Sequence, residues 1–394
     1  MQAQTHVPLT FQRYQELAAL TDQKRDPGSG LAFPLLGLFG ETGSLLSEVK
    51  KKQRDAASYV GYTGSVAEEL GDVLWYFTSL AARARLSIAD IAHSLNRGLE
   101  NWDNVHAPDL EFASLHQKTS SPQKQPSPAF EDTLLRLAGE VGLLLTDYQS
   151  GRVTTDRDAL SGRLIAIFRS LVHAATEAGV TLEQAAKGNL AKISDRWPQR
   201  KEYPTLFDQD CPLEEQLPRE LSIEVFERAV AERRFVFQRC NGVNIGDRLT
   251  DNIMKPDDYR FHDVFHYAYA AVLGWSPVTR ALFRLKRKSR PEIDEGQDGA
   301  RAALVEEGIA TWIFGQAKEL DFFTGMKAPD LSFGLLKSVR RFVTGYEPEK
   351  CPLWLWEEAI FQGYDAFRFL KEERRGRLHL ELNRRRLTVE RLPE

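Results

Sequence analysis

Two sets of oxygen-bearing side chains near the start of the chain have a spacing that suits metal coordination. Glu41, Ser44 and Glu48 stand at i, i+3 and i+7, and Glu69 and Asp72 stand at i and i+3. On helices, each set would lie on one face. If two such faces meet, their carboxylates repel one another unless a cation lies between them. Because all these ligands are oxygens, the pattern predicts Mg²⁺ or Mn²⁺ rather than Zn²⁺, which prefers His or Cys.

The same acids would also suit a solvated helix face, which is the commoner role of an isolated E-x-x-D pattern. Here the surrounding sequence, EELGDVLWYF, is apolar, and Leu70, Val73 and Leu74 leave little room for a freely hydrated stripe. Gly71 lies between the two acids and would let another helix approach closely. This context favours metal binding over a solvated face.

A second candidate site lies in the C-terminal part of the chain. His262 and His266 stand at i and i+4, so both rings would project from one helical face. Further on, Glu306 and Glu307 lie in another apolar segment that predicts a helix. Two histidines with the carboxylate of Glu306 would suit a transition metal such as iron, manganese or zinc. The alternative is that both histidines are ordinary core residues, as histidines on apolar helices usually are.

The chain also contains an internal repeat. Residues 36–49 (LGLFGETGSLLSEV) align without gaps on residues 135–148 (LRLAGEVGLLLTDY). Further on, RLSIADIAHSLNRGLENW is matched by GVTLEQAAKGNLAKISDRW with one insertion. The two segments therefore read as copies of one helical module. The second copy has Arg163 and Ala166 where the first has acids, so it cannot hold the same metal.

Together, GLFGETGSLLSEVKK and AEELGDVLWYF resemble the MazG nucleotide pyrophosphohydrolase domain, an all-α member of the dUTPase-like superfamily. In that family an E-x-x-E pattern and a later E-x-x-D pattern hold magnesium. Carried over to this chain, Glu41 is the first acid, Glu69 the third and Asp72 the fourth. Ser44 stands in place of the second acid. The resemblance then implies that either Ser44 or Glu48, one turn further on, completes the metal site.

The activity that this resemblance implies is hydrolysis of a nucleoside triphosphate between its α and β phosphates, which yields a monophosphate and pyrophosphate. Metal ions would hold the phosphate oxygens and activate a water molecule, and Glu41 or Glu48 would accept its proton. Lys51 follows the acidic turn and would meet the phosphates. It equally suits the C-terminal end of a helix, where a cation is favourable.

The second copy would pair with the first as a pseudo-dimer within one chain. In the family, a last helix with basic or amide side chains contacts the nucleotide, often across a subunit interface. The resemblance implies that Lys192 and Arg196 take this role here. The alternative is a structural half with surface cations. Whether the whole chain forms a homo-oligomer stays open.

Helical periodicity runs through most of the chain, so the sequence predicts an all-α, or mainly α, fold of tandem helical bundles followed by a helical domain. We expect a module at 1–106, a linker at 107–128, a degenerate module at 129–197, a linker at 198–218 and a C-terminal domain at 219–394. In this domain, residues 222–237 are expected to form a helix. Only the tail, LHLELNRRRLTVERL, alternates with period two and predicts a small terminal β-hairpin.

The composition bears on partners and location in the cell. The 394 residues include 52 Lys and Arg against 56 Asp and Glu, a net charge of −4. This chain lacks the excess of cations that non-specific nucleic-acid binding needs, apart from a local basic run at residues 280–290. No apolar run approaches the roughly 20 residues of a membrane span, and no export signal is evident, so we expect a cytoplasmic protein. The three scattered cysteines predict reduced thiols.

The leading prediction is a metal-dependent nucleoside triphosphate pyrophosphohydrolase. One alternative is a nucleotide-sensing protein whose C-terminal His/Glu metal site carries a separate hydrolase or oxidoreductase activity. Another is a nucleotide-binding regulator without turnover, which Ser44 and the acids missing from the second copy would favour.

Overall fold

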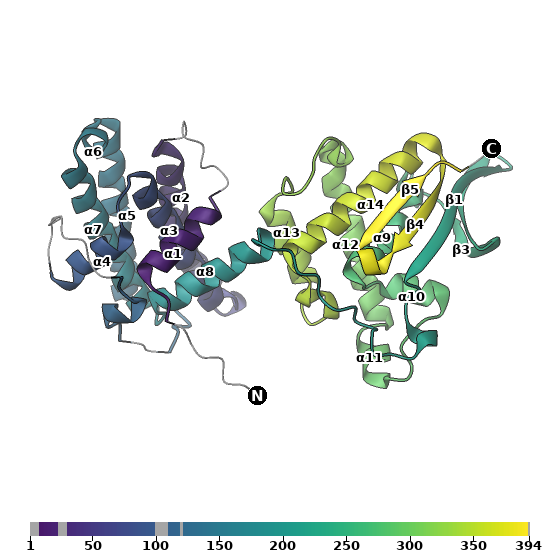
Figure 1. Ribbon diagram of the computed structural model, residues 1–394, viewed down its shortest axis with the longest axis horizontal. Coiled ribbons are helices and arrows are strands. Elements are labelled where there is room, and N and C mark those ends of the chain that lie inside the picture. The colour runs from purple at the N-terminus through teal and green to yellow at the C-terminus, as the bar shows by residue number, and fades with distance from the viewer. Residues whose placement is uncertain (1–7, 23–29, 99–108, 119–120, 393–394) are drawn as a thin grey trace. The chain divides into compact units, whose positions relative to one another are not determined.

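The chain forms two compact units, Met1–Ser194 and Asp195–Glu394. The computed structural model describes residues 8–22, 30–98, 109–118 and 121–392. Within these residues the first unit is helical, whereas the second combines helices with a sheet (Figure 1).

The N-terminal unit is built from helices, the last of which continues two residues past Ser194. These are α1 (Phe11–Leu20), α2 (Ala32–Asp55), α3 (Tyr62–Arg83), α4 (Ile88–Asn96), α5 (Pro128–Gln149), α6 (Arg152–Thr155), α7 (Arg157–Glu177) and α8 (Leu182–Arg196), with 3₁₀ turns η1 (Ala56–Ser58) and η2 (Phe112–Leu115). Apolar residues from both halves of the unit share one core; Leu38, Phe77, Leu137 and Phe168 are completely buried in it. The two repeated segments therefore fold against each other within this unit.

Local sequence explains where several of these helices begin. Thr10, Ser87, Ser127 and Asp156 each accept a hydrogen bond from a backbone N–H in the first turn of α1, α4, α5 and α7 respectively. Such caps satisfy amide groups that have no partner within the helix.

The segment between the two repeats also contributes to this core. Phe112 of η2 is buried, and its ring stacks on that of Phe11 with centroids 4.1 Å apart. Thr10 and Glu111 form an isolated antiparallel bridge. Residues 109–118, which fall in the first expected linker, are therefore attached to α1 through both backbone and ring contacts.

The C-terminal unit contains a five-stranded antiparallel sheet, so the prediction of an all-α fold is wrong. The strands are β1 (Glu220–Val230), β2 (Arg233–Cys240), β3 (Val243–Leu249), β4 (Arg375–Glu381) and β5 (Arg386–Glu390), in the order β3-β2-β1-β4-β5. The terminal hairpin was correctly predicted, but it joins this larger sheet through β1. The helix expected at residues 222–237 is instead most of β1 and the start of β2.

The reason for this error is visible in the burial pattern. Ile223 and Val225 are buried in β1, two residues apart, and Val236 is buried in β2, where it pairs with Glu227. Their apolar neighbours Phe226 and Phe237 pair on the other face, where their rings stack. A run with apolar residues on both faces matches helical spacing as well as strand alternation, so periodicity alone did not separate the two.

The helices of this unit are α9 (Asp263–Ala268), α10 (Pro277–Phe283), α11 (Pro291–Gly296), α12 (Ala300–Glu319), α13 (Phe333–Phe342) and α14 (Leu353–Glu373). Of these, α9, α10 and α14 contact the strands. Shorter turns are η3 (Leu213–Glu215), η4 (Tyr259–Phe261), η6 (Asp321–Phe323), η7 (Glu347–Lys350) and η8 (Leu382–Arg384), while the π-helical turn η5 (Tyr269–Leu273) continues α9. Every residue from Val264 to Leu273 is buried, which makes α9 and η5 the central helix of this unit. Gly363 of α14 allows close packing there, since an added Cβ would lie 3.2 Å from atoms of Phe265 and Ala268.

The basic run at residues 280–290 is not a uniform surface patch. Arg280 is buried and pairs with Asp208 at 2.7 Å. Arg287 is also buried and pairs with Asp298 at 2.7 Å and with Glu347 at 2.8 Å. These two cations therefore stabilise the fold. They are not available to the phosphate-rich ligand that a basic surface patch would bind.

Two further expectations concern the cysteines and membranes. Cys211, Cys240 and Cys351 are all free and buried, as reduced thiols would be. Within the described residues, every helix is too short or too polar to span a bilayer.

Candidate functional site

Three carboxylates from α2 and α3 meet in the N-terminal unit. One oxygen each from Glu41, Glu69 and Asp72 lies within 4.8 Å of the others, and each side chain is partly buried. The helix α3 is held in place by Leu70, Val73 and other apolar residues on its opposite face. The convergence predicted from helical spacing is therefore present for these three acids.

The electrostatics of this acidic cluster (Glu41, Glu69 and Asp72) indicate a shortage of positive charge. Burial, together with the charges of Asp72 and Glu41, raises the pKa of Glu69 to about 8. Burial and Asp72 also raise the pKa of Glu41. A hydrogen bond joins the Glu41 and Glu69 carboxyl groups, which requires a shared proton, and Glu69 Oε2 is buried without a hydrogen-bond partner. Such a set of oxygens fits a hard divalent cation.

The helix α8 supplies the donors that face Asp72. Asn189 donates from Nδ2 to Asp72 Oδ1 at 2.7 Å. The Lys192 ammonium group contacts both oxygens of Asp72 and lies 3.2 Å from Glu68 Oε1. Burial works to lower the pKa of Lys192, and Asp72 and Glu68 outweigh it and raise the pKa. Lys192 is therefore a charged neighbour of the acidic cluster, contributed by the second repeat.

Close packing of α3 and α8 makes these contacts possible. A Cβ atom added to Gly71 would lie 2.8 Å from the carbonyl oxygen of Ala185 and 3.0 Å from Asn189 Cβ. Only a glycine allows the two helices this approach, in agreement with the expectation from sequence. Asn189 and Glu68 were not among the predicted site residues. Asn189 could have been found from its spacing, because it lies three residues before Lys192 and so on the same face of α8.

In the second repeat, an arginine occupies the position of one of the clustered acids and pairs with the remaining carboxylates. Arg163, which aligns with Glu69, donates from Nε to Asp147 Oδ2 at 2.7 Å and lies 4.0 Å from Glu140 Oε2. Its guanidinium group neutralises acids that align with Glu41 and Glu48. This repeat therefore satisfies its own carboxylates without an external ion.

The other predicted residues of the first module occupy different positions. The Ser44 hydroxyl hydrogen-bonds Glu41, which favours the ionised form of that carboxylate. Glu48 is buried and accepts hydrogen bonds from Lys51 Nζ at 2.6 Å and from the Tyr59 hydroxyl. Glu48 and Lys51 thus form a local pair, and Glu48 is not one of the three carboxylates that converge.

Arg196 belongs to the C-terminal unit, and its partners lie within that unit. Its guanidinium group is buried, donates to the carbonyl oxygens of Pro329 and Leu331, and lies 3.6 Å from Glu357. The same group makes cation–π contacts with the rings of Trp197 and Phe333, at 4.8 and 5.6 Å from their centroids. The hydrogen bonds engage Nη2, while Nε and Nη1 are buried without a hydrogen-bond partner. Lys192, in contrast, lies beside the acidic cluster.

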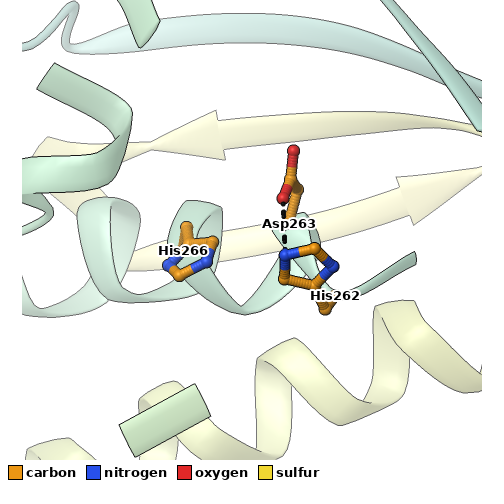
Figure 2. A group of neighbouring side chains, drawn as sticks. All are labelled: His262, Asp263 and His266. Carbon is orange, nitrogen blue, oxygen red and sulfur yellow. Dashed lines mark ion pairs between the residues drawn. The ribbon is translucent and has the colours of Figure 1, made fainter. Parts of the chain in front are cut away.

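The two histidines of the second candidate site lie on one side of α9 and its preceding turn, as predicted (Figure 2). Together with Asp263 they place three potential ligand atoms within 4.8 Å of one another. Burial lowers the pKa of His262. Burial also works to lower the pKa of His266, and Glu306 outweighs it and raises the pKa well above its usual value. Glu306 itself contacts Nδ1 of His266, while Glu307 faces its Nε2.

The comparisons with known proteins concern this second unit. The arrangement of its parts, a five-stranded antiparallel sheet backed by helices that carry a histidine and carboxylate cluster, defines a mixed helical and β domain. Residues 202–393 match the family model described as the MazG C-terminal domain. The match is to a domain named for MazG, and it covers the C-terminal unit. It does not extend into residues 1–201, so the resemblance of the N-terminal repeats to MazG stays a prediction. No curated protein and no solved structure matches the chain.

Proposed function

We propose that the N-terminal unit is a metal-dependent nucleoside triphosphate pyrophosphohydrolase, with Mg²⁺ or Mn²⁺ held by the acidic cluster of Glu41, Glu69 and Asp72. The observation that carries this proposal is the convergence of three carboxylates, one of which, that of Glu69, has a buried oxygen without a hydrogen-bond partner. When bound, the metal would hold phosphate oxygens and increase the acidity of a water molecule. The MazG C-terminal match is consistent with a nucleotide substrate.

In the proposed reaction, water attacks the α-phosphorus and the bond to the bridging oxygen of the pyrophosphate group breaks. The products are a nucleoside monophosphate and pyrophosphate, and one proton is released. Glu41 is the better candidate to accept that proton, because Glu48 already accepts hydrogen bonds from Lys51 and Tyr59. Ser44 would orient Glu41 through their hydrogen bond.

Lys192 would neutralise charge on the substrate. Its ammonium group contacts both Asp72 and Glu68, so a triphosphate that approaches the acidic cluster would meet a positive charge there. A phosphate oxygen would then replace one of its present carboxylate contacts. The second repeat thereby contributes to a site whose acids come from the first.

The test is pyrophosphate release from a panel of ribo- and deoxyribonucleoside triphosphates with Mg²⁺ and with EDTA. We expect Mg²⁺-dependent release, reduced on the order of 10²-fold or more in Glu41→Gln, the substitution that removes the proposed base. Asp72→Asn should raise the Mg²⁺ concentration needed for half-maximal activity. The matched control is Glu140→Gln in the second repeat, beside Arg163, which should leave activity unchanged. Equal activity of Glu41→Gln, Asp72→Asn and the parent chain would refute the proposal.

A second candidate function is nucleotide binding without turnover. The observations that favour it are the lysine beside Asp72 and the serine at position 44 in place of an acid. Calorimetry with a non-hydrolysable triphosphate distinguishes the two functions. Binding that depends on Lys192, without pyrophosphate release from any substrate in the panel, would establish the regulator.

A further inference from the structure

We propose that the C-terminal unit contains a separate site for a divalent transition-metal ion, formed by α9, its preceding turn and α12. The proposed ligand atoms are Nε2 of His262, Nε2 of His266 and one carboxylate oxygen each of Asp263 and Glu307. Glu306 is a positioning residue that holds His266.

The hydrogen bonds at Nδ1 determine which ring nitrogen of each histidine is available. Nδ1 of His262 lies 2.9 Å from the carbonyl oxygen of Tyr259, and Nδ1 of His266 lies 2.9 Å from Glu306 Oε1. A carbonyl and a carboxylate oxygen only accept, so both Nδ1 atoms carry the proton. The lone pair of each neutral ring is then on Nε2, the form in which histidine binds metals.

The two Nε2 atoms and two carboxylate oxygens face one another. Asp263 Oδ1 lies 3.2 Å from His262 Nε2, the pair joined by the dashed line in Figure 2. Glu307 Oε2 lies 3.4 Å from His266 Nε2 and 3.9 Å from His262 Nε2. Metal bonds of 2.0–2.1 Å in tetrahedral geometry separate ligand atoms by roughly 3.3 Å. The contacts of 3.2 and 3.4 Å match this spacing, whereas the 3.9 Å between Glu307 and His262 would have to shorten for both to bind one ion.

His266 is the strongest single indication of a ligand. It is 1% exposed, and its Nε2 atom is buried without a hydrogen-bond partner. The Glu307 oxygen at 3.4 Å cannot donate to it when ionised. Beside carboxylate oxygens this buried nitrogen must hold either a proton or a metal ion, and the experiment below distinguishes the two.

The residues behind the ligands hold them in place, as in known metal sites. Glu306 is completely buried and also accepts from the Ser276 hydroxyl at 2.6 Å and from the Val278 N–H at 2.9 Å. On the other side, Gln238 donates to Asp263 Oδ2, which leaves Oδ1 to face His262. The His262 ring stacks on Tyr259, with centroids 4.4 Å apart and planes inclined by 4°.

The ligand set and exposure define the kind of ion. Two imidazole nitrogens with two carboxylates suit Zn²⁺, Fe²⁺ or Mn²⁺, whereas Mg²⁺ prefers oxygen ligands alone. The Glu307 side chain is 41% exposed although His266 is buried, so the ion would be reached by solvent from the α12 side. Because four protein ligands complete a tetrahedral site, water or a substrate would bind the ion by displacing the exposed Glu307 carboxylate or as a fifth ligand.

The experiment measures Zn²⁺ binding to the full chain after removal of metals with EDTA, by calorimetry and elemental analysis. All variants carry Asp72→Asn, which weakens binding at the N-terminal acidic cluster. We expect one tight zinc per chain, lost in His266→Ala and in His262→Gln. Glu306→Gln should weaken binding about 10- to 100-fold, because it weakens the hydrogen bond that orients His266. The matched control is His379→Ala on β4, a half-exposed histidine paired with Glu390, which should bind as the parent does.

A cobalt titration supplies an independent readout. Co²⁺ bound by two imidazoles and carboxylates gives visible absorption bands, and these should disappear in His262→Gln while circular dichroism shows a folded chain. His262→Gln is included because His266→Ala removes a completely buried ring and can disturb folding. Unchanged zinc stoichiometry in both histidine variants, or in His262→Gln alone when His266→Ala is unfolded, would overturn the proposal. It would indicate a proton on His266 Nε2 in place of the metal.

Discussion

The ammonium group of Lys192 on α8 contacts the carboxylate of Asp72 on α3, although the two residues are 120 positions apart in sequence. Asp72 lies beside Glu41 and Glu69, and the contact brings a positive charge of the second repeat to the acids of the first. Lys192 therefore neutralises part of the acidic cluster in the absence of a metal, and a substrate phosphate would compete for the same ammonium group.

Removal of this charge should destabilise the metal-free protein. Lys192→Met leaves three neighbouring carboxylates with one cation fewer, and we expect a loss of about 1–3 kcal/mol in unfolding free energy. Mg²⁺ should restore most of the loss, because a divalent ion would replace the missing charge. Urea unfolding with EDTA and with Mg²⁺ measures both effects.

A second lysine on α8 provides the control for this substitution. Lys187 pairs with Glu183 at 2.6 Å on a more exposed face of the helix. Lys187→Met should change the unfolding free energy by no more than about 0.5 kcal/mol, with no dependence on Mg²⁺. Equal effects of the two substitutions would mean that Lys192 is an ordinary helix-surface cation.

The response to Mg²⁺ should depend on pH through Glu69. Its pKa is raised from 4.5 to about 8, mainly by burial and then by Asp72. Between these values the folded chain holds a proton that the unfolded chain releases, so this group's contribution to stability falls as pH rises. A bound cation favours the ionised carboxylate and opposes that trend. The gain in melting temperature on adding Mg²⁺ should be larger at about pH 8.5 than at about pH 6.

Two measurements would check this interpretation of Glu69. Melting temperatures at several pH values, with EDTA and with Mg²⁺, give the trend directly. Glu69→Gln carries no titratable proton and should lose most of the pH dependence of the Mg²⁺ effect. A Mg²⁺ effect that is the same at both pH values in the parent chain would contradict a proton on Glu69.

The acidic cluster could be largely predicted from sequence because its geometry is local. Helical spacing alone places Glu69 and Asp72 on one face, and the two long helices α2 and α3 are neighbours in sequence. The donors from α8 depend instead on packing through Gly71, which no local pattern encodes. Glu48 was assigned to the same face as Glu41, but its contacts with Lys51 and Tyr59 depend on the turn that follows α2.

The second candidate site illustrates a different limit. Glu306 and Glu307 are adjacent on α12, and side chains one residue apart point about 100° from each other on a helix. Which of the two faces Nε2 of His266 depends on the rotation of α12, which is determined by tertiary packing. The structure places Glu307 there and Glu306 at Nδ1. The sequence had favoured Glu306 as the ligand.

The sheet was missed although part of its signal was present. Asn241 and Gly242 both have positive φ, 49° and 79°, in a two-residue turn between Cys240 and Val243. An Asn-Gly pair between strands is a strong hairpin signal. The pairing of β1 with β4, which follows more than a hundred residues later, depends on contacts that a single sequence does not display. Apolar residues on both faces of β1 then favoured the helical interpretation.

A methyl group at Gly71 should separate α3 from α8. In Gly71→Ala the new Cβ would lie 2.8 Å from the Ala185 carbonyl oxygen, so the backbone must move. We expect a loss of about 1–3 kcal/mol in unfolding free energy and weaker contacts between Asp72 and its donors on α8. Gly64→Ala in the same helix is the control, since nothing lies within 4 Å of its added Cβ. That substitution should stabilise the chain by up to about 1 kcal/mol, and a loss as large as that of Gly71→Ala would contradict the packing argument.

Arg287 should be essential for the stability of the C-terminal unit. Its guanidinium group is buried and makes hydrogen bonds to Asp298 and Glu347, while the Asp298 carboxylate is also buried. Arg287→Met keeps most of the apolar stem but leaves Glu347 without this cation and Asp298 with only Arg280, at 3.7 Å, and should cost about 3–5 kcal/mol. Lys288→Met, at the neighbouring exposed position, should stay within about 0.5 kcal/mol of the parent chain. Urea unfolding followed by tryptophan fluorescence compares the two, and a small loss in Arg287→Met would show that solvent compensates for the missing guanidinium group.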